Sequence, residues 1–190
     1  MDETTFLGLP LATAPGRVMT PRAATEHLVR AAAERLGAGS ARVADVGTGS
    51  GAVALALALA APNAEVWATD ISAESVLLAR VNAHRLHVGD RVHVVQGDLL
   101  APVPGELDLI VANLPYLARD AAGNHPDLVV EPDSAVFAAG DGLGPYRRLL
   151  TAAAEKLRPG GAVAIQLHRR VFLAERDALS VLRATLPAVA

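Results

Sequence analysis

A strand that runs directly into a glycine-rich turn constrains the fold of this 190-residue chain most. Residues 45–51 have the sequence Asp-Val-Gly-Thr-Gly-Ser-Gly, after an apolar run and before a long alanine- and leucine-rich run. Glycines permit the sharp bend and let a ligand approach main-chain N–H groups at the start of the next helix. The segment therefore predicts a strand–turn–helix unit that binds a nucleotide-like ligand.

Short apolar runs alternate with longer helix-forming segments along the chain, which is the pattern of a mainly parallel sheet. The predicted strands are residues 42–46, 65–69, 91–96, 107–112 and 162–167. The predicted helices are residues 21–36, 50–61, 72–86, 145–157 and 170–186. We expect the strands to be covered on both faces and helix 50–61 to be fully buried. The predicted fold class is α/β, with a doubly wound, mainly parallel sheet.

Two segments do not follow this alternation. Residues 1–20 are expected to form an N-terminal arm or hairpin ahead of one domain over residues 21–190. Residues 114–144 form a stretch rich in proline and glycine, and such long loops in a compact domain are usually functional or disordered.

Composition narrows the function classes. The net charge of −3 gives no global attraction to nucleic acid, and the longest apolar stretch is too short to cross a bilayer. The chain has no cysteine, which removes disulfides and thiol chemistry and fits a reducing compartment. We expect a cytoplasmic protein that does not act in a membrane.

Carboxylates lie at the ends of the first three predicted strands, where they would surround a ligand on the glycine turn. Asp70 lies where it could accept both hydroxyls of a ribose, and Asp98 where it could meet an adenine amino group. Asp45, directly before the glycines, suits a cofactor with a cationic amino-acid tail. S-adenosylmethionine (AdoMet) has that tail and is the predicted cofactor.

A dinucleotide cofactor is the alternative at the same turn. Gly47, Gly49 and Ala52 satisfy the Gly-x-Gly-x-x-Gly/Ala pattern of NAD-binding folds, with an acid near the expected distance. Asp45 argues against it, because a carboxylate is unhelpful beside a pyrophosphate. A dehydrogenase is therefore the least favoured enzyme class.

The fourth predicted strand ends in Asn113, Leu114, Pro115 and Tyr116. This segment resembles the motif of AdoMet-dependent methyltransferases that act on the nitrogen of a planar amide or exocyclic amine. Such a nitrogen is a poor nucleophile, so the site must hold its NH2 by both hydrogens. The expected acceptors are the Asn113 side-chain oxygen and the Leu114 carbonyl, while Tyr116 stacks on the planar group and Pro115 stiffens the turn.

Further segments resemble one subfamily, the HemK/PrmC proteins that methylate a glutamine side chain of peptide-release factors. The similar segments are residues 6–10, 20–29, 131–136, 140–143 and 146–148. The resemblance implies a class I AdoMet-dependent methyltransferase (Rossmann-like) fold, AdoMet as cofactor and a release factor as protein partner.

The resulting site prediction has two parts. The cofactor-binding residues are expected to be Asp45, Gly47, Thr48, Gly49, Gly51, Asp70, Ile71, Asp98, Leu99 and Asn113. The catalytic residues are expected to be Asn113, Pro115 and Tyr116, which bind the substrate together with Leu114. No metal site is expected, because His84, His87 and His93 lack a supporting cysteine or paired acid.

The chain also departs from this subfamily. Leu114 replaces a proline, and Gln166 and His168 stand where Glu and Gly are expected. An N-terminal helical domain ahead of residue 1 and the last two strands of a seven-stranded sheet are expected to be lacking. The fifth strand would then be an exposed edge, which the C-terminal tail covers, or a homo-oligomer or partner subunit covers, unless the chain is a fragment.

Two other functions stay open. One is an adenine-N6 methyltransferase on RNA or DNA, whose motif the Asn-Leu-Pro-Tyr segment also resembles. The other is an AdoMet-binding module without catalysis. Arg147 and Arg148 are expected to be a solvated basic pair, and Glu131 an exposed acid in a turn that could instead shape substrate entry.

Overall fold

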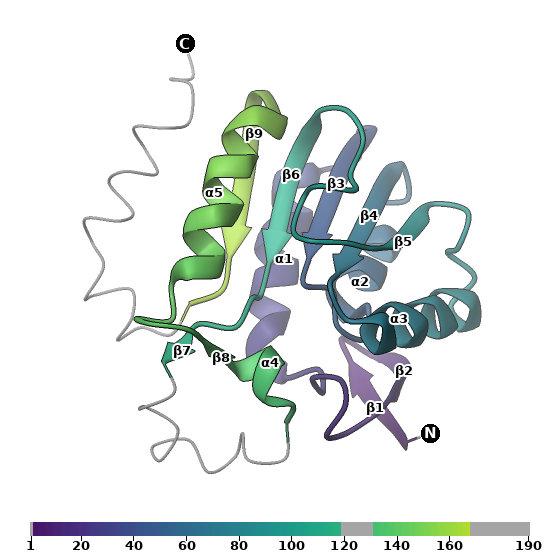
Figure 1. Cartoon of the computed structure of the whole chain (residues 1–190). Helices are drawn as coiled ribbons and strands as arrows, with labels where there is room; N and C mark the ends of the chain where they lie inside the picture. The colour runs from purple at the N-terminus through teal and green to yellow at the C-terminus, as the bar shows by residue number, and fades with distance from the viewer. Residues whose placement is uncertain (1, 119–130, 168–190) are drawn as a thin grey trace.

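The computed structural model describes residues 2–118 and 131–167, which build a five-stranded parallel sheet (Figure 1). The strand order is β5-β4-β3-β6-β9, and every neighbouring pair is parallel. The strands are β3 (Ala41–Val46), β4 (Ala64–Asp70), β5 (Val92–Gln96), β6 (Leu107–Ala112) and β9 (Leu157–Ile165). The central strands β3 and β6 are almost entirely buried, as their mostly apolar sequences predict.

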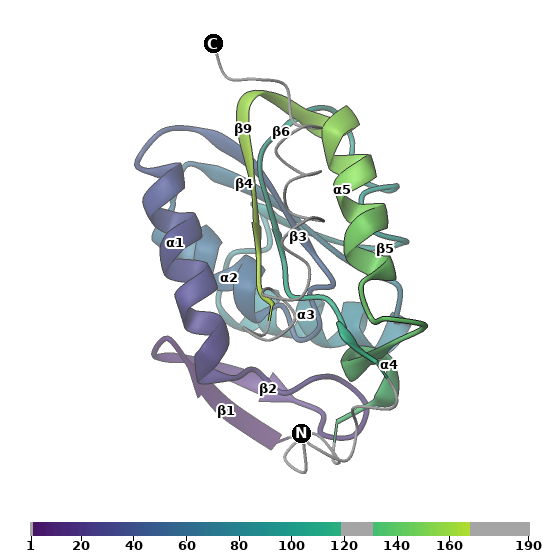
Figure 2. The same cartoon turned by 90° about the vertical axis from the view of Figure 1, so that its left-hand side faces the viewer.

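Helices cover both faces of the sheet (Figure 2). One core contains buried residues of α1 (Glu26–Leu36), α2 (Ala52–Ala60) and α3 (Ala73–Arg85) with those of β3 and β4. The opposite core joins α5 (Gly144–Lys156) to β3 and β6. Helices on both faces of a parallel sheet confirm the predicted doubly wound α/β fold.

Local sequence explains where several helices begin. The Ser72 hydroxyl accepts a hydrogen bond from the Ser75 N–H at 3.3 Å, which caps α3. Pro145 lies in the first turn of α5, where its missing N–H costs nothing. Helix α2 is buried up to Ala58, but Leu59 is 40% exposed, so the expectation of a fully buried helix is wrong at its end.

Three predicted boundaries need correction. Residues 21–36 do not form one helix, because a 3-10 turn, η1 (Ala23–Thr25), precedes α1. The fifth strand begins at Leu157 instead of residue 162, since Leu157 pairs with Leu107 before a register shift at the Pro-Gly-Gly segment. It ends at Ile165, although the Gln166 N–H still bonds to the Ala112 carbonyl at 3.1 Å. Apart from the buried Leu157, the residues of β9 are exposed or only partly buried, so this edge strand is not covered on both faces by the described residues.

The N-terminal segment forms the hairpin β1 (Asp2–Phe6) and β2 (Leu9–Thr13), which lies below the carboxyl ends of the strands in Figure 1. Phe6 and Leu11 belong to the core of α1, α2 and α3. The predicted domain boundary at residue 20 stays a prediction.

The segment 114–144 has more structure than a loop. It contains α4 (Asp133–Val136) and a small parallel pair of strands, β7 (Leu117–Ala118) and β8 (Phe137–Ala138). Residues 119–130 of this segment, the predicted helix 170–186 and His168 lie outside the described residues. Among the described helices, none is long and apolar enough to span a membrane.

Candidate functional site

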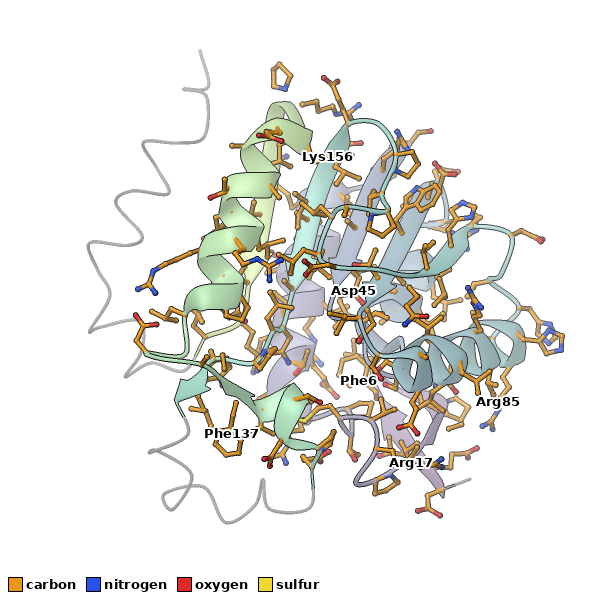
Figure 3. The ribbon with its side chains drawn as sticks, in the orientation of Figure 1. Phe6, Arg17, Asp45, Arg85, Phe137 and Lys156 are labelled. Carbon is orange, nitrogen blue, oxygen red and sulfur yellow. The ribbon has the colours of Figure 1, made fainter. Side chains whose placement is uncertain are left out.

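A cavity of about 520 Å³ lies at the carboxyl edge of the sheet. Strand β3 has β4, the next strand in sequence, on one side and β6 on its other side, so the order of the strands reverses there. Ligands of open α/β sheets bind at such a switch point. Figure 3 shows Asp45 at this edge, with Phe6 and Arg17 on the hairpin side and Lys156 at the opposite end of the sheet. The sequence-predicted residues that line the cavity are Asp45, Gly47, Thr48, Gly49, Asp70, Ile71, Asp98, Leu99, Asn113, Leu114, Pro115 and Tyr116.

The glycine turn adopts a backbone that other residues rarely adopt. Gly47, Gly49 and Gly51 all have positive φ, at 74°, 56° and 85°. A Cβ atom on Gly47 would lie 2.6 Å from Leu114 Cδ2, and one on Gly51 would lie 3.2 Å from Ala79 Cβ. Gly47 thus lets the Asn-Leu-Pro-Tyr segment pack on the turn, whereas Gly51 does not line the cavity and packs under it against α3.

Asp45 stabilises this turn from beneath. Its Oδ2 accepts hydrogen bonds from the Thr48 hydroxyl at 2.7 Å and from the Ala54 N–H at 3.1 Å. Burial raises the pKa of Asp45 to about 6, and the two hydrogen bonds offset that effect only in part. A cation bound nearby would favour the charged form of this carboxylate.

The two other acids also have protein partners. Asp70 accepts the Gly49 N–H through Oδ2 and the Ser72 N–H through Oδ1, both at 2.9 Å. Asp98 forms an ion pair with Arg148 of α5. The Arg148 side chain is 62% exposed, in line with the expected solvated pair, but it also has this carboxylate partner and lines the cavity.

The Asn-Leu-Pro-Tyr segment forms the opposite wall. Asn113 donates from Nδ2 to the Thr25 hydroxyl oxygen at 3.2 Å, and its Oδ1 accepts no hydrogen bond from any residue that the structure describes. The Leu114 N–H donates to the Tyr146 hydroxyl oxygen at 2.9 Å. The Tyr146 hydroxyl proton faces the carbonyls of Leu114, at 3.1 Å, and Gln166, at 2.7 Å.

Tyr146 accounts for the leucine at position 114. Leucine carries a backbone N–H that proline lacks, and a buried N–H without a partner is costly. Burial raises the pKa of Tyr146 well above its usual range, so its hydroxyl stays protonated. The hydroxyl oxygen accepts the Leu114 N–H, and its one proton lies between the carbonyls of Gln166 and Leu114.

Tyr116 and the segment before the sheet close the cavity on this side. Burial raises the pKa of Tyr116, and the nearby charge of Arg22 partly offsets that rise. Glu131 accepts the Thr20 N–H at 3.1 Å and pairs with Arg22 at 3.5 Å. Its side chain is 4% exposed, so the expectation of an exposed acid is wrong.

Some residues of the site were missed or are placed differently than expected. Thr25, Glu131 and Tyr146 lie in segments that resemble the HemK/PrmC pattern, and this resemblance is the signal that could have found them. The buried Gln166 Oε1 has no hydrogen-bond partner among the described residues. Ile71 is 72% exposed at the rim.

In the described part of the chain, no group of three His, Cys, Asp or Glu side chains lies close enough together to hold a metal ion. His93 instead pairs with Glu65 at 2.8 Å.

Comparisons with known proteins agree with this geometry. The chain is 46% identical over 165 residues to a release factor glutamine methyltransferase of Moorella thermoacetica, covering 85% of this chain and 58% of the relative. It is 46% identical over 160 residues to one of Deinococcus radiodurans, covering 83% and 57%. The chain thus spans little more than half the length of these curated relatives.

A solved structure and a family model also match this chain, and both are of methyltransferases. The ribosomal protein L11 methylase of Lactobacillus delbrueckii subsp. bulgaricus is 26% identical with a TM-score of 0.58, over 88% of this chain and 71% of that one. The model of the methyltransferase small domain matches residues 21–130, which include the glycine turn, all three acids and the Asn-Leu-Pro-Tyr segment. This chain therefore belongs to the methyltransferase small domain family.

Proposed function

We propose that this chain is an AdoMet-dependent methyltransferase that transfers a methyl group to the side-chain amide nitrogen of a glutamine in a peptide-release factor. One observation carries the proposal: the glycine turn and the Asn-Leu-Pro-Tyr segment are walls of a single cavity. The names of the curated relatives support the substrate. The cysteine-free composition favours the cytoplasm as its location.

The residues of the glycine turn fit AdoMet. The buried Asp45 carboxylate has a raised pKa and would gain from a cationic amino-acid tail. Asp70 would accept ribose hydroxyls in addition to the two N–H groups that it already holds, since each carboxylate oxygen has two lone pairs. Asp98 would have to exchange part of its ion pair with Arg148 for an adenine amino group. Thr48, Ile71 and Leu99 would complete the contacts.

The acceptor amide would be held on the opposite wall. AdoMet supplies an electrophilic methyl group on a sulfonium when it is bound. Asn113 Oδ1 and the Leu114 carbonyl would each accept one hydrogen of the NH2 group, which fixes the direction of the nitrogen lone pair. Tyr116 would pack on the amide plane and exclude water, and Pro115 would keep the turn stiff. No strong base is needed before transfer, because the proton leaves the nitrogen afterwards.

A nucleic-acid substrate is less well supported by the charges at the cavity. Three arginines line it, Arg17, Arg22 and Arg148, and two of them already pair with a carboxylate: Arg22 with Glu131 and Arg148 with Asp98. Phosphate binding at Arg22 or Arg148 would have to compete with these pairs. The adenine-N6 hypothesis is therefore an outcome for the experiment to decide.

The test is transfer from AdoMet labelled in its methyl group to a purified bacterial release factor, to ribosomal RNA or to neither. We expect label on the release factor, and peptide mass spectrometry should place it on a glutamine. Label on RNA alone would establish the alternative, and AdoMet binding with no transfer to either would favour a module without catalysis. Binding of NADH but not AdoMet would end the methyltransferase hypothesis.

A further inference from the structure

We infer that Thr25, which lies outside the Asn-Leu-Pro-Tyr segment, is a positioning residue that turns the oxygen of the Asn113 amide toward the acceptor. The inference rests on the proposed function for its catalytic consequence, but its structural part stands on the contacts alone. Thr25 Oγ1 accepts the hydrogen bond from Asn113 Nδ2 at 3.2 Å, across 88 residues of sequence.

The direction of the Asn113 amide decides what it can bind. Its oxygen only accepts and its NH2 only donates, so an amide turned by 180° would face the acceptor NH2 with a second donor. In the structure the Thr25 hydroxyl oxygen accepts from Nδ2, and this orientation of the amide leaves Oδ1 available. Asn113 lines the cavity and is partly exposed, and Oδ1 has no partner among the described residues, so the free atom is the accepting one.

Thr25 is itself well held. It is 7% exposed at the end of η1, and its N–H donates to the Arg22 carbonyl at 2.9 Å. The neighbouring Glu26 accepts the Leu7 N–H at 3.4 Å. Arg22 and Thr20 both contact the buried Glu131, so the segment is fixed on both sides of Thr25.

The same contact restricts the class of acceptor. With Oδ1 as its free atom, Asn113 can hold a nitrogen that carries hydrogen, and it repels a group that only accepts. The site would therefore discriminate a carboxamide from the carboxylate that differs only by NH2. Discrimination of this kind is strong, because the rejected group leaves polar atoms unpaired.

The test compares Thr25→Val, which removes the hydroxyl and keeps the shape, with Thr25→Ser, which keeps the hydroxyl. We expect Thr25→Val to lower kcat/KM for a purified release factor roughly 3- to 10-fold, with the AdoMet dissociation constant unchanged. Thr25→Ser should retain most of the activity. Thr13→Val is the matched control, because Thr13 is a buried threonine outside the cavity, and it should transfer at the wild-type rate.

A second readout does not depend on catalysis. In ¹⁵N NMR spectra, the Asn113 side-chain signals, assigned by their loss in Asn113→Asp, should shift in Thr25→Val and return in Thr25→Ser. Unchanged Asn113 signals in Thr25→Val, or wild-type kcat/KM for that variant, would overturn the role of Thr25. Absence of transfer by the wild-type protein would instead overturn the proposed function, while the NMR comparison would still decide about Thr25.

Discussion

The two walls of the cavity are built in different ways. The glycine-turn wall is held by hydrogen bonds between residues close in sequence: Thr48–Asp45, Ala54–Asp45 and Gly49–Asp70 are 3, 9 and 21 residues apart. The Asn-Leu-Pro-Tyr wall is held by long-range contacts. Leu114–Tyr146, Asn113–Thr25 and Thr20–Glu131 are 32, 88 and 111 residues apart.

This difference indicates how each wall can vary. A wall made by β3, the glycine turn, α2 and the next strand β4 forms whenever this continuous stretch of chain folds, so it can serve many methyltransferases. A wall made from distant segments changes when any one of them changes, so it is suited to set the acceptor. We therefore expect substitutions on the first wall to affect AdoMet binding and substitutions on the second to affect transfer.

The largest effect should follow Asn113→Ala, which removes the acceptor for one hydrogen of the substrate amide. We expect transfer to fall by about 100-fold or more, as when a single positioned hydrogen-bonding group is lost from an active site. AdoMet affinity by calorimetry should change less than about twofold. The control is Asn63→Ala, since Asn63 bonds to Ala38 outside the cavity. Wild-type turnover in Asn113→Ala would remove Asn113 from the chemistry.

On the first wall, Asp45→Asn should weaken AdoMet binding roughly tenfold or more, because it removes the buried charge opposite the cationic tail. The same change should stabilise the ligand-free protein. The Asp45 pKa rises from 3.8 to about 6 on folding, so the wild type loses stability as the pH rises through that interval.

Urea unfolding of both proteins between pH 4 and pH 7.5 checks the sign of this effect. The advantage of Asp45→Asn should grow up to about pH 6 and then level off, at no more than about 3 kcal/mol. If the stability of Asp45→Asn relative to the wild type fell as the pH rises, the pKa of Asp45 would not be raised in the folded protein.

The place where the two walls touch can be tested with Gly47→Ala and Gly8→Ala. Both glycines have positive φ, so alanine should cost about 1 kcal/mol at either position. Only at Gly47 does the added Cβ meet another atom, Leu114 Cδ2, while nothing lies within 4 Å at Gly8. We expect Gly47→Ala to lose roughly 1–2 kcal/mol more than Gly8→Ala in urea unfolding. Equal losses of stability in the two variants would mean that the Leu114 side chain moves away from the added Cβ without destabilising the protein.

The smallest effect should follow Arg148→Ala, which breaks the exposed ion pair that links α5 to Asp98. Stability should change by less than about 1 kcal/mol. The AdoMet dissociation constant should fall by up to about 3-fold, because Asp98 no longer gives up a partner on binding. Arg147→Ala, which breaks the pair with Asp141, should leave that constant unchanged. Weaker binding in Arg148→Ala would make Arg148 a contact for the ligand.

The sequence predicted the first wall better than the second for the same physical reason. Strand β3 and the glycine turn follow from a local, mostly apolar run and from alternate glycines. The burial of Glu131 and the pairing of Arg148 depend on partners that only the fold brings near. Glu131 was therefore expected to be exposed, and the ion pair of the exposed Arg148 was not expected. The early start of β9 has a similar cause. Pro159 and the two glycines after it resemble a turn, and the pairing of Leu157 with Leu107 of β6 is visible only in the fold.

A crystal structure with S-adenosylhomocysteine and a glutamine-containing release-factor peptide tests the central claim most directly. The account predicts both ligands in the one cavity, with the glutamine NH2 within hydrogen-bonding distance of Asn113 Oδ1 and the Leu114 carbonyl. A peptide bound away from these two oxygens, or a nucleoside seated away from the glycine turn, would contradict it.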